Sequence, residues 1–193
     1  MAEDLLHRII AIPEDYGSIH VNAIERQGDD LNIFLEVTAD EDPDLPRDIV
    51  VRSSLFSEST LAPGYYAEVI MATDHVLLWQ YNKPHAYVSF YGEAMQPLAV
   101  VGALFERHTD LVGSWIPFQR YLNGGRLSEL IAGRYGLLAQ GPEPLIFAYE
   151  EVMQQHGFST AHHASDKPVE SPKAVLIFHE SFVIAESFNA TAL

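Results

Sequence analysis

The chain has 193 residues, of which 48% are hydrophobic and 11% aromatic, and this apolar content excludes a disordered chain. Its 27 acidic residues against 11 Lys and Arg give a net charge of −16, which argues against nucleic-acid binding, because that binding depends on basic side chains neutralising phosphates. The chain has no cysteine, which excludes disulfides, thiolate metal ligands and a cysteine nucleophile.

The same features predict a cytoplasmic protein. The N-terminal residues carry acids where a secretory signal carries lysines, and their apolar run stops at Pro13, so we expect no signal peptide. No stretch approaches the roughly 18 apolar residues of a membrane-spanning helix, so we expect no membrane insertion. A chain without cysteine also fits a reducing compartment.

The first 91 residues predict one short helix and then strands. Apolar residues at helical spacing indicate a helix over residues 3–12, which Pro13 ends. Residues 31–37 alternate between apolar and mostly polar side chains, as in a half-buried strand, and residues 40–48 form an acidic loop with two prolines. The other strands are expected over residues 19–24, 49–55, 65–71, 76–81 and 86–91.

The second half predicts mainly helices. Apolar residues spaced by three or four indicate a largely buried helix over residues 97–113. Residues 159–173 are polar and contain proline, which predicts a loop, and the last few residues are expected to fray. Two further helices are expected over residues 127–134 and 142–157, and a closing pair of strands over residues 174–178 and 182–185.

Strands first, helices next and strands last predict an α+β fold. We expect residues 1–193 to form a single α+β domain, with a mainly antiparallel sheet of about 6–8 strands and helices from the second half packed on one of its faces. A parallel doubly wound sheet would need helical crossovers, which the first 91 residues lack.

No motif for catalysis or nucleotide binding is complete. His179 and Glu180 begin like a zinc-protease helix, but the second histidine is missing and the segment reads as a strand. Asp40, Asp42 and Asp44 have the first spacings of a calcium loop without its glycine and its final glutamate. The sequence therefore predicts no catalytic residue and no cofactor.

Two groups of residues are candidates for binding. Histidines near the C-terminal end offer nitrogen ligands for a metal, with an exposed polar loop as the alternative interpretation; they are His156, His162, His163 and His179. A second group combines aromatic rings with arginine guanidinium groups and would suit a groove that binds an anion. The alternative interpretation is that the aromatic rings pack in the core and the arginines form ion pairs. The group consists of Trp79, Tyr87, Tyr91, Trp115, Arg120 and Arg126.

The charge is uneven, since residues 1–74 hold 16 of the acids and only four of the bases. We therefore expect a non-enzymatic protein-interaction module, such as an adaptor, an immunity-like inhibitor or a subunit, whose partner is a basic protein. The excess of acid would also serve solubility alone. The alternative function is a small-ligand-binding protein or enzyme that uses the aromatic and arginine groove, and homo-oligomerisation is left open.

Overall fold

A computed structural model describes residues 5–123, 126–165 and 171–193, which divide into two compact units. The first unit runs up to Leu78 and resumes at Ser171, and the second unit begins at Trp79 and ends before Ser171. The expected α+β class is confirmed, because the described residues form antiparallel sheets together with helices. The expected sheet of 6–8 strands is wrong in number, since the described residues form twelve strands in three sheets. The single domain over residues 1–193 stays a prediction.

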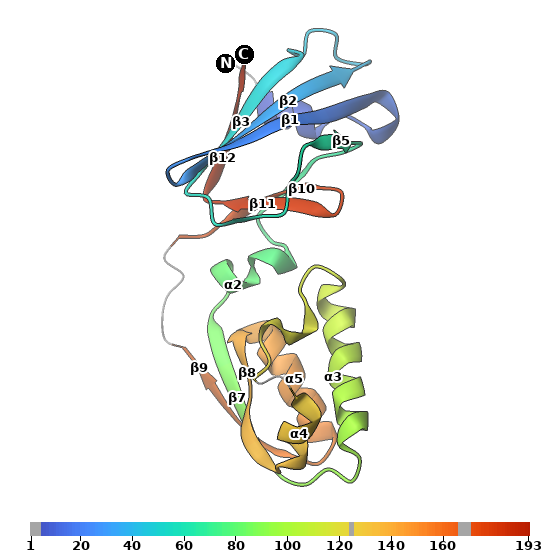
Figure 1. The fold of residues 1–193 in the computed structure, drawn as a ribbon, viewed down its shortest axis with the longest axis vertical. Helices are drawn as coiled ribbons and strands as arrows, with labels where there is room; N and C mark the ends of the chain where they lie inside the picture. Colours follow the sequence, from blue (N-terminus) through green and yellow to red (C-terminus); the bar gives the residue numbers. More distant parts are fainter. Residues whose placement is uncertain (1–4, 124–125, 166–170) are drawn as a thin grey trace. The chain divides into compact units, whose positions relative to one another are not determined.

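The first unit contains two antiparallel sheets (Figure 1). The larger has the strand order β12-β3-β2-β1-β5, with a bulge in β1 after Val21. Its strands are β1 (Gly17–Gln27), β2 (Asp30–Ala39), β3 (Asp48–Ser54), β5 (Gly64–Tyr66) and β12 (Ser187–Ala192). The smaller sheet has the order β4-β11-β10-β6, formed by β4 (Glu58–Ser59), β6 (Ile70–Ala72), β10 (Ala174–Phe178) and β11 (Ser181–Ala185).

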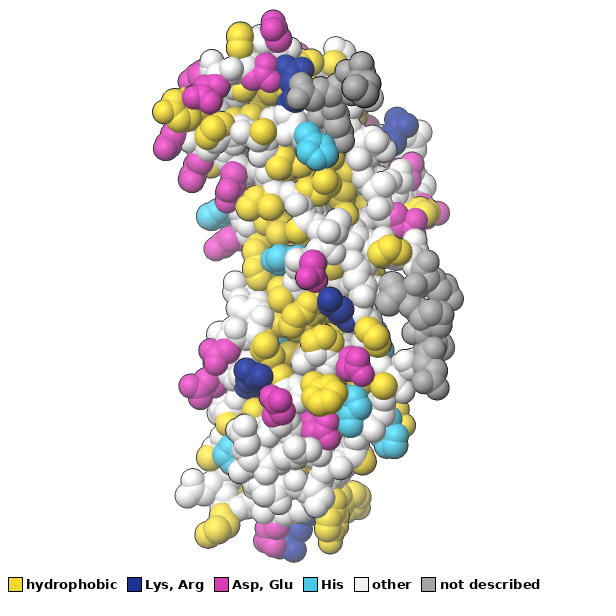
Figure 2. All heavy atoms as spheres, turned by 180° about the vertical axis from the view of Figure 1, so that it is seen from behind, with side chains coloured by type: hydrophobic (Ala, Val, Ile, Leu, Met, Phe, Trp, Pro, Cys, Tyr) yellow, Lys and Arg dark blue, Asp and Glu magenta, His cyan; other side chains and the backbone are white. Residues whose placement is uncertain are grey.

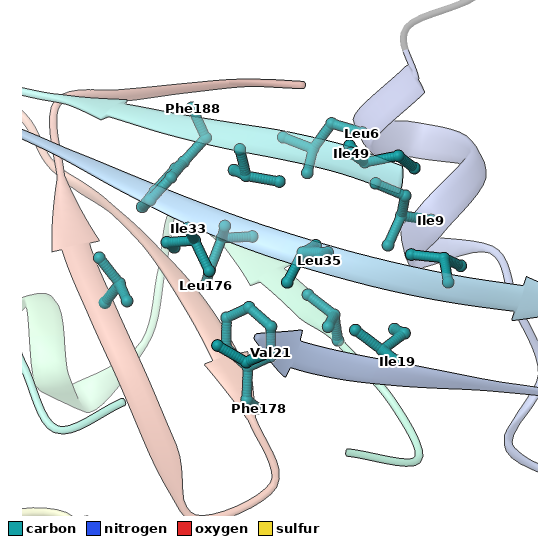
Figure 3. Close-up of a cluster of buried hydrophobic side chains, with 14 of the residues drawn as sticks. Leu6, Ile9, Ile19, Val21, Ile33, Leu35, Ile49, Leu176, Phe178 and Phe188 are labelled. Carbon is teal, nitrogen blue, oxygen red and sulfur yellow. The ribbon is translucent and has the colours of Figure 1, made fainter. Parts of the chain in front are cut away.

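One hydrophobic core joins these two sheets and the short helix α1 (Leu5–Ile10). Alternate residues of β2 point inward, as the sequence pattern predicts, and Ile33 and Leu35 are almost fully buried. Figure 3 shows them between Leu6 of α1 and Phe178 of β10. The first unit also contains the short helices η1 (Glu14–Tyr16) and η2 (Val76–Leu78).

The acidic loop lies between β2 and β3, as expected. Arg8 of α1 donates two hydrogen bonds to the carboxylate of Asp42, at 2.9 Å from Nε and 2.7 Å from Nη2. This guanidinium lowers the pKa of Asp42, chiefly through the hydrogen bonds. A protein cation therefore lies against the central aspartate of the calcium-like run.

The second unit has one three-stranded antiparallel sheet with the order β8-β7-β9, and α5 lies on one of its faces (Figure 1). Helix α3 packs against α5, and α4 packs against α3 and β8. The strands are β7 (His85–Tyr91), β8 (Tyr135–Pro142) and β9 (Ser159–Ala164). The helices are α2 (Trp79–Asn82), α3 (Pro97–Val112), η3 (Phe118–Arg120), α4 (Leu127–Ala132) and α5 (Glu143–Gln155).

Helix α5 forms where the sequence places it. Pro144 lies in its first turn, where proline costs no hydrogen bond, and Gly157 follows its end with a φ of 84°, a conformation that favours glycine. Its buried residues include Leu145, Tyr149 and Met153, which recur at a spacing of four.

Several sequence predictions are wrong in detail. Residues 76–81 are not a strand but η2 and the start of α2, because a short apolar run fits either structure. The expected strand over residues 65–71 is divided between β5 and β6, which belong to different sheets. The C-terminal residues are not frayed, since β12 pairs with β3 from Ser187 to Ala192.

The polar segment 159–173 also differs from the prediction. Residues 159–164 form β9, which pairs with β7, and residues 166–170 lie outside the described part of the chain. Strand β8 was not predicted, because Gly136 and Pro142 read as breaks.

The helices of the second half do not pack on one large sheet, as expected, but on the three-stranded sheet of the second unit. Helix α3 is also less buried than expected, since the side chain of Leu98 is 76% exposed and that of Phe105 is 54% exposed. None of the described helices is long and apolar enough to cross a membrane.

Candidate binding surface

One face of the sheet β8-β7-β9 carries α5, and the other face exposes tyrosines. In β7 the even residues Ala86, Val88 and Phe90 are buried, so the odd residues project from the opposite face. Residues directly opposite each other in a ladder share a face, which adds residues of β8 and β9. We call this surface the tyrosine face. Taken over the odd residues 87–91 of β7 and the residues opposite them, it consists of Tyr87, Ser89, Tyr91, Tyr135, Leu137, Gln140, Ser159, Ala161 and His163.

Two cross-strand pairs supply the exposed rings of the tyrosine face. Tyr91 and Tyr135 lie opposite each other, and each is 71% exposed. Tyr87 lies opposite His163, and their rings stack with centroids 4.7 Å apart and an angle of 18° between planes. The nine residues of the face include no Asp, Glu, Lys or Arg. The surface is therefore aromatic, hydrogen-bonding and without formal charge when His163 is neutral.

The structure thus brings together Tyr87, Tyr91 and His163, three of the ten residues singled out from the sequence. The expected shared side of Tyr87 and Tyr91 is observed. Tyr135 was missed, because its position on this face depends on the unpredicted strand β8 and on its register with β7.

Trp79 and Arg120 lie elsewhere in the second unit. Trp79 is half-buried in α2. The sequence predicted that Trp79 and Tyr81 belong to one strand, but both lie in this helix. Arg120 donates through Nη2 to Oε1 of Gln80 at 2.8 Å, and the hydroxyl of Tyr121 donates to the same oxygen at 3.1 Å. The guanidinium of Arg120 also lies over the Tyr121 ring, 5.8 Å from its centroid.

Trp115 is half-buried in the connector after α3, and Arg126 is exposed beside a groove. Arg126 donates through Nη1 to Oε1 of Glu129 at 2.6 Å, so a carboxylate already lies against its guanidinium group. The groove has a volume of about 290 Å³, and its apolar lining comes from Leu98, Val101, Phe118, Leu122 and Leu127, with Arg126 among the polar lining residues.

The four histidines are not gathered into one site. His156 is exposed at the end of α5, His162 and His163 project to opposite faces of β9, and His179 occupies the turn between β10 and β11 in the first unit, with a φ of 55°. Among the described residues, no group of three or more His, Asp or Glu side chains is placed to hold a metal ion.

His162 lies under the sheet, in a polar cluster with α5. Its Nδ1 is 3.1 Å from Oε2 of Glu150, and its Nε2 is 3.8 Å from Oε1 of Glu143. Both ring nitrogens are shielded from solvent, and neither is aligned for a hydrogen bond to a described residue. Oε1 of Glu150 accepts from the hydroxyl of Thr160 at 2.7 Å, and that hydroxyl accepts from Nε2 of Gln154 at 2.8 Å. This cluster holds β9 against α5.

The two units differ in charge. The first unit contains 18 of the 27 acids and five of the 11 Lys and Arg, which leaves the second unit nine acids and six bases. Figure 2 shows acidic side chains on the part of the surface that the first unit forms. The acidic surface and the tyrosine face therefore belong to different units.

No protein-family model, curated protein or solved structure matches this chain.

Proposed function

We propose that this chain is a non-enzymatic protein-interaction module whose contact surface is the tyrosine face. The supporting observation is the exposed pair of Tyr91 and Tyr135 on an uncharged sheet surface. Tyrosine combines a large apolar ring with a hydroxyl, and aromatic residues are enriched at protein interfaces, where charged residues are depleted. A surface of this composition suits the centre of an interface, with the hydroxyls and His163 as hydrogen-bonding groups.

The proposed partner is a basic protein. The acidic first unit would speed the encounter with such a partner, because complementary charge mainly raises the association rate. An adaptor, an immunity-like inhibitor or a subunit of a larger assembly would each work in this way, and the proposed location is the cytoplasm. Association faster at low salt than at high salt would support the role of charge.

Affinity purification tests the proposal. The wild-type chain and a Tyr91→Ser/Tyr135→Ser variant are immobilised and exposed to a lysate of the native host, and retained proteins are identified and their affinities measured. Loss of a buried interface tyrosine removes about 2 kcal/mol or more of binding free energy, which is roughly a thirtyfold weakening. We expect the double variant to lose the partner.

Tyr65→Ser is the matched control, since Tyr65 is 77% exposed in the first unit and lies outside the tyrosine face. Equal binding by the double variant and the wild type would exclude the tyrosine face. A chain that retains no protein at all would count against the interaction function itself.

The groove beside Arg126 favours a second function, the binding of a small molecule. Its apolar lining would suit a hydrophobic body, and the arginine would suit a carboxylate or phosphate that displaces Glu129. A thermal-shift screen with such anions tests this function, because a ligand of the native state raises Tm by mass action. A shift that disappears in Arg126→Gln supports the groove, and a screen without any shift contradicts it.

A further inference from the structure

Among the described residues, strand β9 forms an edge of the sheet in the second unit that no other strand pairs with. The order β8-β7-β9 leaves two edges, and the chain itself covers the one at β8. There Leu122 forms a β-bridge with Ala139. The backbone N–H of Asn123 donates to the carbonyl of Leu138 at 2.8 Å, and the backbone N–H of Gln140 donates to the carbonyl of Tyr121 at 2.9 Å. Within the described ranges, the backbone of residues 159–164 makes ladder hydrogen bonds to β7 alone. Figure 1 shows β9 at the outside of this sheet.

The register shows which backbone groups face outward. The N–H of Ser165 donates to the carbonyl of His85 at 2.7 Å, one position beyond the pair Ala164 and Ala86. In an antiparallel ladder, opposite residues alternate between pairs that exchange hydrogen bonds and pairs that do not. The hydrogen-bonded residues of β9 are therefore 159, 161 and 163. Thr160, His162 and Ala164 direct their N–H and C=O groups away from β7.

Within residues 159–164, the strand itself lacks the sequence features that usually prevent strand addition. Proteins protect exposed edges with lysines, prolines, bulges or covering segments. The sequence of β9, Ser-Thr-Ala-His-His-Ala, contains no charged residue other than the titratable histidines and no proline, and its register with β7 is unbroken.

Each side of the edge also carries an exposed aromatic ring. On the helix side Phe147 is 52% exposed, and its ring centroid lies 4.8 Å from that of His162. On the open side Tyr87 stacks on His163. A strand added to β9 would place alternate side chains beside these two aromatic groups.

We propose that β9 receives an extended segment of a protein partner as the fourth strand of this sheet. The inference rests on the interaction function proposed above and states how the partner binds: backbone hydrogen bonds to Thr160, His162 and Ala164, with apolar side chains at alternate positions of the added segment. A second copy of this chain is a poorer occupant, because two chains that each carry a net charge of −16 repel each other. Glu143, which is half-buried beside His162, favours a basic residue on the helix side of the added strand.

The test uses a phage-displayed library of random linear peptides, selected against the full-length protein, with the best binder then synthesised as the probe. Ala164→Pro removes an outward N–H without removing a ladder bond to β7, and proline is tolerated at such an edge position. Ala164→Ser keeps the N–H and is the matched control. We expect Ala164→Pro to weaken peptide binding roughly tenfold or more and Ala164→Ser to leave it unchanged.

Amide hydrogen exchange provides a readout in the wild-type chain, independent of any variant. The amides of Thr160, His162 and Ala164 should exchange fast in the free protein and slowly with bound peptide, whereas those of Ala161 and His163 should be protected in both states. A bound peptide that leaves the three outward amides fast would overturn strand addition and leave the tyrosine face as the interface.

Two other outcomes also overturn the proposal. A library that yields no binder overturns strand addition. The affinity purification with the Tyr91→Ser/Tyr135→Ser variant then tests the proposed interaction function separately. Slow exchange of the three outward amides in the free protein, together with a dimeric mass in solution, would show that a second copy occupies the edge.

Discussion

The hydroxyl of Tyr149 in α5 lies 2.8 Å from Nδ1 of His108 in α3, and both side chains are buried. The other ring nitrogen of His108 lies 2.6 Å from the carbonyl oxygen of Ile116. A carbonyl oxygen only accepts, so Nε2 donates to it. In the neutral imidazole, Nδ1 then accepts the hydroxyl hydrogen of Tyr149. This chain of two hydrogen bonds connects the two long helices to the connector that follows α3.

Tyr149→Phe should therefore destabilise the fold. The substitution preserves the ring and leaves Nδ1 of His108 buried without its donor, which costs about 1–3 kcal/mol. The measurement is the free energy of unfolding in urea at neutral pH. Tyr87→Phe, which removes a hydroxyl from an exposed ring, is the control and should change stability by less than about 0.5 kcal/mol. Equal stability of Tyr149→Phe and the wild type would contradict the hydrogen-bond assignment.

The same tyrosine predicts a loss of stability in alkali. Burial, followed by the charge of Tyr121, raises the pKa of Tyr149 above its ordinary value of 10.0. Above about pH 10 the unfolded chain releases this proton while the folded chain keeps it, so stability falls as the pH rises, by about 1.4 kcal/mol per pH unit. Below about pH 10 both states hold the proton, and the contribution is fully present. Urea unfolding between about pH 9 and pH 11 should show a steeper decline for the wild type than for Tyr149→Phe, and parallel declines would contradict the raised pKa.

Thr160→Val tests the polar cluster under β9. Valine preserves the shape of the side chain and removes the hydroxyl that donates to the buried carboxylate of Glu150. A hydrogen bond to a charged group contributes about 1.5–3 kcal/mol, so we expect a loss of that size in the free energy of unfolding. Ser159→Ala, at an exposed position of the same strand, is the control. A variant as stable as the wild type would show that Gln154 replaces the lost donor.

The helical part of the second unit was largely predictable because its signals are local. Apolar residues of α3 recur at spacings of three or four, and Gly157 follows α5 with a positive φ, as its position in the sequence indicates. The same reasoning overestimated the burial of α3, because a stripe of apolar residues does not show how far the neighbouring elements extend over it. Leu98 and Phe105 consequently remain exposed.

The tyrosine face was only partly predictable because it depends on long-range register. Tyr87 and Tyr91 share a strand, so their common face follows from a period of two. Tyr135 joins them only because β8 pairs with β7 around a bulge between Val88 and Ser89, which no local pattern specifies. Strand β9 was misread as a loop because its small and polar residues fit an exposed edge as well as a turn.

The single-domain prediction can be tested by two spectroscopic probes. Both tryptophans, Trp79 and Trp115, belong to the second unit, so tryptophan fluorescence reports on that unit, whereas far-ultraviolet circular dichroism reports on both. If residues 1–193 form one cooperative domain, both signals change at the same Tm. Two separated transitions, with fluorescence following only one of them, would contradict a single domain.

Two glycine substitutions should have opposite effects on stability. A Cβ at Gly17 would lie 2.4 Å from Cγ2 of Ile12 and 2.5 Å from the backbone oxygen of Thr38, so Gly17→Ala forces the start of β1 away from its neighbours. Overpacking of this kind costs about 1–3 kcal/mol.

A Cβ at Gly102, within α3, meets nothing within 4 Å, and alanine restricts the unfolded chain, so Gly102→Ala should stabilise the fold by about 0.5–1 kcal/mol. Thermal unfolding should give a lower Tm for Gly17→Ala and a higher one for Gly102→Ala. A rise in Tm for Gly17→Ala would contradict the close approach of Ile12 and of Thr38 in β2 to this residue.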